Sequence, residues 1–143
     1  MFRFPSAEWV EHYRDAINQN PAYKVGGANW DKGVVALICK AKPEIGLAED
    51  VGIWLDLHKG VCREARVVSA EEARTAPFCI TAEYERWKQV IRKELNPITG
   101  MLQGKLRLKG DLPTIVRFVD ASKALVESAG MVPTIFPDEQ PAS

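Results

Sequence analysis

The sequence predicts an α+β fold, in which a mostly antiparallel sheet has its helices gathered on one face. Residues 51–58 and 61–68 have strand patterns and flank Lys59-Gly60, a dipeptide that suits a tight hairpin turn. The expected strands carry polar residues at their outer positions, as antiparallel sheets with one solvated face do. The expected order along the chain is helix, four strands, two helices, strand and helix.

The first half of the chain is expected to contain one helix followed by strands. Ser6 is a typical helix N-cap residue, and apolar residues recur four apart from Trp9 to Ile17. Asn20-Pro21 predicts the end of this helix, and residues 21–32 have the composition of a loop. The strands expected next cover residues 33–42, 51–58 and 61–68, and the charges of 61–68 predict an edge strand.

The second half is expected to be richer in helices. Thr81 follows a short strand at 78–80 and is expected to cap a helix over residues 82–95. Asn96-Pro97 predicts a shorter helix that ends at Gly104. The remaining expected elements are a helical turn at 70–74, a strand at 105–109, a turn at Gly110-Asp111, a helix at 112–129 and its C′ residue Gly130.

Length and composition indicate one domain. The chain has 143 residues, which matches the size of a single domain, and we assign this domain to residues 1–130. Residues 131–143 form a tail with three prolines, and Ile135 and Phe136 are expected to dock it on the body. The 19 basic and 19 acidic residues balance, whereas nucleic-acid binding usually requires a basic excess. No signal-peptide pattern begins the sequence, so a cytoplasmic location is expected.

The chain's three cysteines, Cys39, Cys62 and Cys79, are expected to be buried thiols. Their odd number and their spacing do not predict a disulfide framework. His58 and Cys62 flank the hairpin turn, but zinc sites usually contain paired ligands two to four residues apart, and the sequence has no such pair. We therefore expect no metal and no cofactor. Thiol chemistry at Cys62 or Cys79 is the enzymatic alternative, and it requires a base close to the sulfur.

The clearest family signal lies in residues 96–111, NPITGMLQGKLRLKGD. A helix ends in Gly104-Lys105, a short basic and apolar strand follows, and Gly110-Asp111 precedes the last helix. This run resembles the signature of the sterol-carrier-protein type 2 family, and the resemblance extends over residues 6–129. It implies a five-stranded sheet covered by helices and an apolar tunnel. It also implies binding or transfer of a fatty acyl chain, a sterol or an isoprenoid, rather than catalysis.

The tunnel wall is expected to combine the inward side chains of the sheet with those of the helices that cover it. The expected ligand-binding residues are Ile53, Leu55, Phe78, Ile80, Trp87, Ile91, Met101, Leu102, Leu106, Leu108, Ile115 and Val119. The basic stripe of Lys105, Arg107 and Lys109 either contacts anionic lipid headgroups transiently or protects a strand edge. The alternative function is a dimerisation module of the same fold, with a closed cavity and with Ile135-Phe136 packed on a neighbouring copy.

Overall fold

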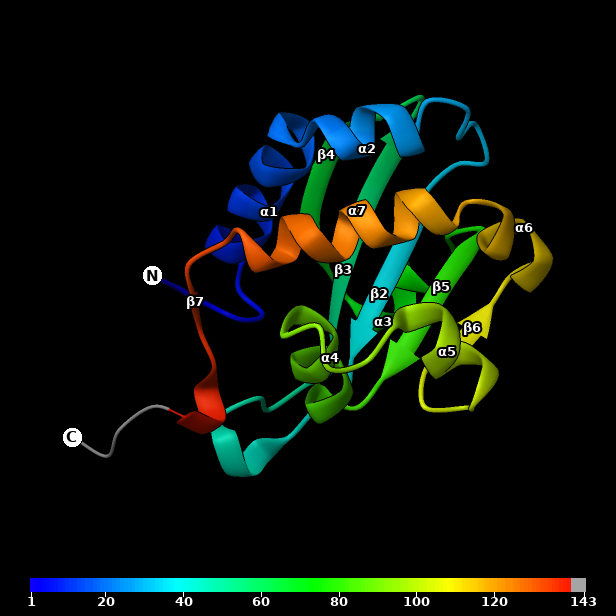
Figure 1. Ribbon diagram of the computed structural model, residues 1–143. Coiled ribbons are helices and arrows are strands. Elements are labelled where there is room, and N and C mark those ends of the chain that lie inside the picture. Colours follow the sequence, from blue (N-terminus) through cyan, green and yellow to red (C-terminus); the bar gives the residue numbers. More distant parts are fainter. Residues whose placement is uncertain (140–143) are drawn as a thin grey trace.

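A five-stranded sheet forms the centre of the computed structural model, which describes residues 1–139 (Figure 1). The strands lie in the order β4-β3-β2-β5-β6, and β2 and β5 are the one parallel pair in this sheet. The predicted α+β class with a mostly antiparallel sheet is therefore confirmed. The strand bounds are β2 Val35–Cys39, β3 Val51–His58, β4 Val61–Val68, β5 Phe78–Ala82 and β6 Arg107–Lys109.

The hairpin between β3 and β4 has the predicted turn. Lys59 and Gly60 have φ angles of 47° and 81°, and two positive φ angles are the requirement of the hairpin turn that matches strand twist. His58 pairs with Val61 on either side of this turn. The hairpin places β4 at the sheet edge, where its outward charged side chains remain in water.

The register of the sheet gathers apolar side chains on one face. Val35 of β2 pairs with both Leu55 of β3 and Phe78 of β5, and Leu37 is flanked in the same way by Ile53 and Ile80. Residues that pair directly point to the same side of a sheet, so these side chains form a continuous apolar inner face. The main hydrophobic core lies on this face.

Six of the seven helices of the described chain contribute to that core, and Figure 1 shows α7 crossing the sheet. The short helix α3 (Ala70–Ala73) is the exception, because Ala73 packs with Ala36 and Ile38 on the opposite face. The other helices are α1 Ala7–Gln19, α2 Pro21–Gly26, α4 Tyr84–Ile91, α5 Pro97–Leu102, α6 Leu112–Arg117 and α7 Val119–Gly130. Two 3₁₀ turns cover Pro43–Ile45 and Pro137–Glu139.

Several sequence expectations about the helices are wrong, including the end of the helix expected at 82–95, which stops at Ile91. Residues 21–26 form α2 rather than a loop, because Pro21 occupies the first turn and the Asn20 side chain accepts a hydrogen bond from the Ala22 N–H. Sheet pairing extends to Ala82, so Thr81 lies in β5 and α4 begins only at Tyr84. The expected final helix breaks into α6 and α7 at Phe118, and Gly130 lies within α7.

The tail packs on the body through Ile135 and Phe136, as the sequence predicts. β7 (Thr134–Ile135) pairs in parallel with β1 (Phe2–Arg3), and Phe136 is buried. The Asp138 carboxylate accepts a hydrogen bond from the Tyr84 hydroxyl at 2.6 Å and pairs with the Lys88 ammonium at 2.8 Å. Residues 131–139 therefore connect the N-terminal strand β1 to α4.

Asn20 joins α1 and α2 to α7. Its buried side-chain amide donates to the Ala124 carbonyl at 3.3 Å and to the Ser128 hydroxyl at 3.1 Å, while its carbonyl oxygen caps α2. We predict that Asn20→Ala lowers the free energy of unfolding by about 2–3 kcal/mol, because the cap and the interhelical hydrogen bonds are lost together.

Urea denaturation measures this change. The matched control is Gln19→Ala, because Gln19 is exposed one residue earlier, and we expect it to change stability by less than about 0.5 kcal/mol. A loss for Asn20→Ala no larger than that of the control would contradict the role assigned to Asn20.

Candidate functional site

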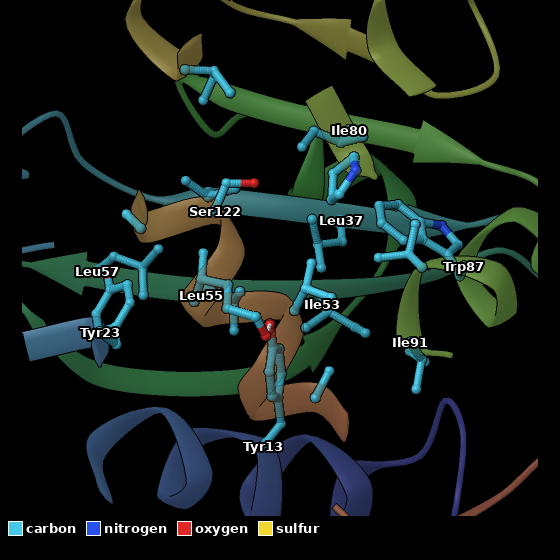
Figure 2. Close-up of a pocket in the computed structure, with 18 of the residues that line it drawn as sticks. Tyr13, Tyr23, Leu37, Ile53, Leu55, Leu57, Ile80, Trp87, Ile91 and Ser122 are labelled. Carbon is cyan, nitrogen blue, oxygen red and sulfur yellow. Dashed lines mark hydrogen bonds between the residues drawn. The ribbon is translucent and has the colours of Figure 1, made fainter. Parts of the chain in front are cut away.

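An apolar cavity lies between the inner face of the sheet and the helices that cover it. Figure 2 shows Leu37, Ile53 and Leu55 on the sheet side, with Tyr13 reaching toward them from α1. The cavity has a volume of about 120 Å³. The lining consists of Phe4, Trp9, Tyr13, Tyr23, Trp30, Val35, Leu37, Cys39, Ile53, Leu55, Leu57, Ile80, Trp87, Val90, Ile91, Pro97, Met101, Ile115, Phe118, Ala121, Ser122, Leu125, Val126 and Ala129.

Aromatic side chains supply much of the wall, and the polar atoms of three of them are hydrogen-bonded to backbone carbonyls. The indole N–H of Trp87 donates to the Ile38 carbonyl at 2.9 Å, and that of Trp30 donates to the Gly33 carbonyl at the same distance. The Tyr13 hydroxyl donates to the Leu125 carbonyl at 3.0 Å. Because these groups are already hydrogen-bonded, the rings offer the cavity mainly carbon surface.

Charge is absent from this wall. Among the described residues that line the cavity, none is an aspartate, glutamate, lysine, arginine or histidine. A charged group placed inside would lose its hydration without gaining a partner, and this carries a large free-energy penalty. The arrangement therefore suits an uncharged, apolar group and contains no acid–base pair for catalysis.

The cysteines remain protonated at neutral pH. Burial raises the pKa of Cys39, which lines the cavity, from 9.0 to about 12, and the nearby Asp50 and Glu83 carboxylates add to this effect. Burial likewise raises the pKa of Cys62 to about 12, and it also raises the pKa of Cys79. Within residues 1–139, no group of three histidine, cysteine or acidic side chains is placed to hold a metal ion.

Seven of the residues expected in the wall line this cavity. They come from β3, β5, α4, α5 and α6, which lie far apart in the sequence. These seven are Ile53, Leu55, Ile80, Trp87, Ile91, Met101 and Ile115.

The other five expected wall residues lie outside the lining. Leu102 is 66% exposed, because it lies on the solvent side of the short helix α5. Val119 is 38% exposed, and it follows the helix break at Phe118 and lines a second, outer hollow instead of this cavity. The remaining three are Phe78, which packs against Trp30, Leu106, which lies beneath Gly100, and Leu108, which is half-buried on β6.

Several lining residues are not among those that the sequence predicts. Trp9 and Tyr13 have the spacing of an ordinary core stripe of the first helix, and Trp30 lies in the segment expected to be a loop. Phe118 joins the wall through an edge-on contact with Trp30, with ring centres 5.0 Å apart. The clustering of aromatic residues in the first 30 positions is the available signal, but it does not distinguish core from cavity.

The fold and the cavity together define a class of protein: a small α+β domain that encloses an apolar site under its helices. The family model of the SCP-2 sterol transfer family matches residues 15–123. The chain therefore belongs to this family of lipid-binding and lipid-transfer domains. No curated protein sequence matches the chain.

Solved structures agree with this assignment. A crystal structure of sterol carrier protein 2 has a TM-score of 0.82 and 30% identity, covering 89% of this chain and 97% of that one. A Thermus thermophilus protein, described as possibly a sterol carrier protein, has a TM-score of 0.82 and 30% identity, covering 91% and 90%. Sterol carrier protein 2 from Yarrowia lipolytica, at 18% identity and a TM-score of 0.54, covers 84% and 88% and shares the fold. No helix within residues 1–139 is long and apolar enough to cross a membrane.

The raised thiol pKa values predict low cysteine reactivity. At pH 8 a pKa of about 12 for Cys39 leaves a thiolate fraction roughly a thousandfold below that of an ordinary thiol. We expect an aromatic disulfide reagent to modify the native chain at least about a hundredfold more slowly than the urea-unfolded chain. For Cys39 the native rate should keep rising with pH above pH 9, because burial shifts the pKa of this thiol upward.

Single Cys→Ala variants assign the residual rate to Cys39, Cys62 or Cys79. Fast modification of one native thiol at pH 8 would contradict the prediction. It would support the alternative that the protein is an enzyme with a reactive cysteine.

Proposed function

We propose that this chain binds a lipid by enclosing its apolar part in the cavity and thereby carries it through water. The observation that supports this most directly is the wall itself, in which aliphatic and aromatic side chains surround the space and no charged side chain takes part. Membership of a sterol transfer family supports the same function. The lipid in this proposal is a fatty acyl chain, a sterol or an isoprenoid.

Apolar burial alone provides enough free energy for such a site. Each buried methylene contributes about 0.8 kcal/mol, and association costs about 4–15 kcal/mol. A chain of a dozen methylenes therefore contributes about 10 kcal/mol, which offsets the middle of this range, and about nineteen methylenes offset its upper end. The part of the ligand inside the cavity is uncharged in this proposal, since the wall supplies no counter-ion.

Ligand entry requires the cavity to widen. Pockets for drug-sized ligands usually hold roughly 300–1,000 Å³, whereas this one holds about 120 Å³. The short helices α5 and α6 bring Met101 and Ile115 to the wall, so a small outward movement of these helices enlarges the space. We propose that they move when a lipid enters.

Transient contact with a membrane fits this function. Lys105, Arg107 and Lys109 are exposed, and Leu102, on the helix just before them, is 66% exposed. A basic residue near an anionic lipid surface contributes about 1 kcal/mol, and one exposed apolar side chain adds to this attraction. We propose that the surface around Leu102 and the three basic residues contacts the membrane from which lipid is collected.

The dimerisation alternative has less support than lipid binding. Phe136 is only 9% exposed, and Ile135 pairs with Arg3 of the same chain. The tail segment that was expected to join two copies is thus already used within one.

Met101→Arg tests the cavity directly. It places a charge in the apolar wall, so we expect affinity for a fluorescent acyl probe to fall at least about tenfold. Leu102→Arg is the matched control, because it makes the same change one residue further on at an exposed position outside the lining, and it should retain binding within about twofold.

Binding is measured by titration in solution and by native mass spectrometry, with thermal melting as a check on folding. Equal affinity of a folded Met101→Arg variant and the original chain would remove Met101 from the site.

A further inference from the structure

A second hollow lies beside the cavity, toward the solvent. It has a volume of about 270 Å³ and lies between α7 and the connection from α4 to α5, which run near each other in Figure 1. Unlike the cavity, it is lined by charged as well as apolar residues, and five of its ten lining residues are apolar. Its polar and charged lining residues are Lys93, Asn96, Ser122, Lys123 and Glu127.

The two hollows share part of their walls. Pro97, Ser122 and Val126 line both the apolar cavity and the outer hollow. These three side chains therefore form the partition between a space without charge and a space with charged walls. Pro97 is the first residue of α5, so movement of that short helix opens the partition.

Two cations of the outer hollow are available for a ligand. Neither Lys93 nor Lys123 forms an ion pair with an acidic side chain of residues 1–139, and both are exposed. The carboxylate in this lining, Glu127, accepts a hydrogen bond from the Asn20 amide at 3.1 Å. This neutral amide leaves the negative charge of Glu127 in place, so the two lysines and one glutamate give the hollow a net positive charge.

Lys93 occupies an unusual place for its residue type. Its φ angle is 63°, and it follows the end of α4, where glycine or asparagine is the usual residue. A hydrogen bond from its N–H to the Val90 carbonyl, 3.0 Å long, holds this conformation. The lysine is therefore fixed at the rim of the hollow by the backbone turn.

We propose that the outer hollow binds the anionic headgroup of a single-chain lipid, with Lys93 and Lys123 as its counter-ions, while the chain passes the Pro97–Ser122–Val126 partition into the cavity. This inference rests on the proposed lipid binding and specifies the ligand class. A lipid with a carboxylate or phosphate headgroup fits this arrangement. The cavity has no cation to pair with a negative charge, whereas the outer hollow has two lysines.

The test compares three probes with the same sixteen-carbon chain: palmitate, hexadecyl phosphate and hexadecanol. Affinities are measured at pH 8 and low salt, below the concentration at which the probes form micelles. We expect the original chain to bind at least one anionic probe about tenfold more tightly than the alcohol. The anionic probe with the greater preference identifies a carboxylate or a phosphate as the better headgroup.

The double variant Lys93→Gln/Lys123→Gln should lose that preference, with about tenfold weaker binding of the anionic probe and hexadecanol affinity within about twofold. The matched control is Lys24→Gln/Lys59→Gln, which removes the same charge from exposed residues outside both hollows and should keep the preference. In the original chain the preference should also shrink as salt is raised, because ions screen exposed charges.

Each outcome separates the two proposals. If the original chain binds none of the three probes, the proposed lipid binding itself is wrong. If it binds all three equally, or if the double variant keeps its preference, the cavity proposal stands and the headgroup site is overturned. Equal weakening of the alcohol and the anions in the variant would indicate a structural effect and would also overturn the headgroup site.

Discussion

The close approach of α2 to α7 is the contact on which the rest of the structure depends. A Cβ atom added at Gly26 would lie 2.9 Å from the Ala121 nitrogen and from the Asp120 carbonyl carbon, so any larger residue there would push the two helices apart. Asn20 ties the same helices together through Ser128. Held along this edge, α7 spans the inner face of the sheet and forms a roof over it. The space that it leaves beneath is the cavity.

A cavity in a protein interior requires an explanation, because interiors normally pack as densely as organic crystals. Here the roof presents small residues such as Ala121 and Ala129, and the aromatic walls are fixed by hydrogen bonds to backbone carbonyls. The side chains are therefore held in place and do not collapse inward. The remaining volume, about 120 Å³, is close to that of engineered apolar cavities of roughly 150 Å³ that admit benzene. Under the function proposed above, this volume would be widened by movement of the short helices when a lipid enters.

The tail strengthens one wall of this cavity by holding α4. Burial disfavours the charged form of Asp138, but hydrogen bonds from Lys88 and Tyr84 outweigh it and lower the pKa of that carboxyl. Hydrogen bonds from Lys88 and Arg92 lower the pKa of Glu139. Both acids are therefore charged at neutral pH, and their contribution to stability is lost only as the pH falls through these lowered pKa values. The ion pairs of Asp138 and Glu139 with Lys88 and Arg92 therefore form at neutral pH and weaken in acid.

The sequence by itself determined the features that depend on neighbouring residues. The Ser6 cap, the turn at Lys59-Gly60 and the family signature of residues 96–111 were readable because caps, turns and helical spacing are local. Only the tertiary structure decided the site. Phe118 breaks the last helix where it packs against Trp30, and Val119 after that break lines the outer hollow instead of the cavity. Such contacts join residues far apart in the chain, so periodicity finds an apolar face but does not reveal whether that face closes on a neighbour or leaves a space for a ligand.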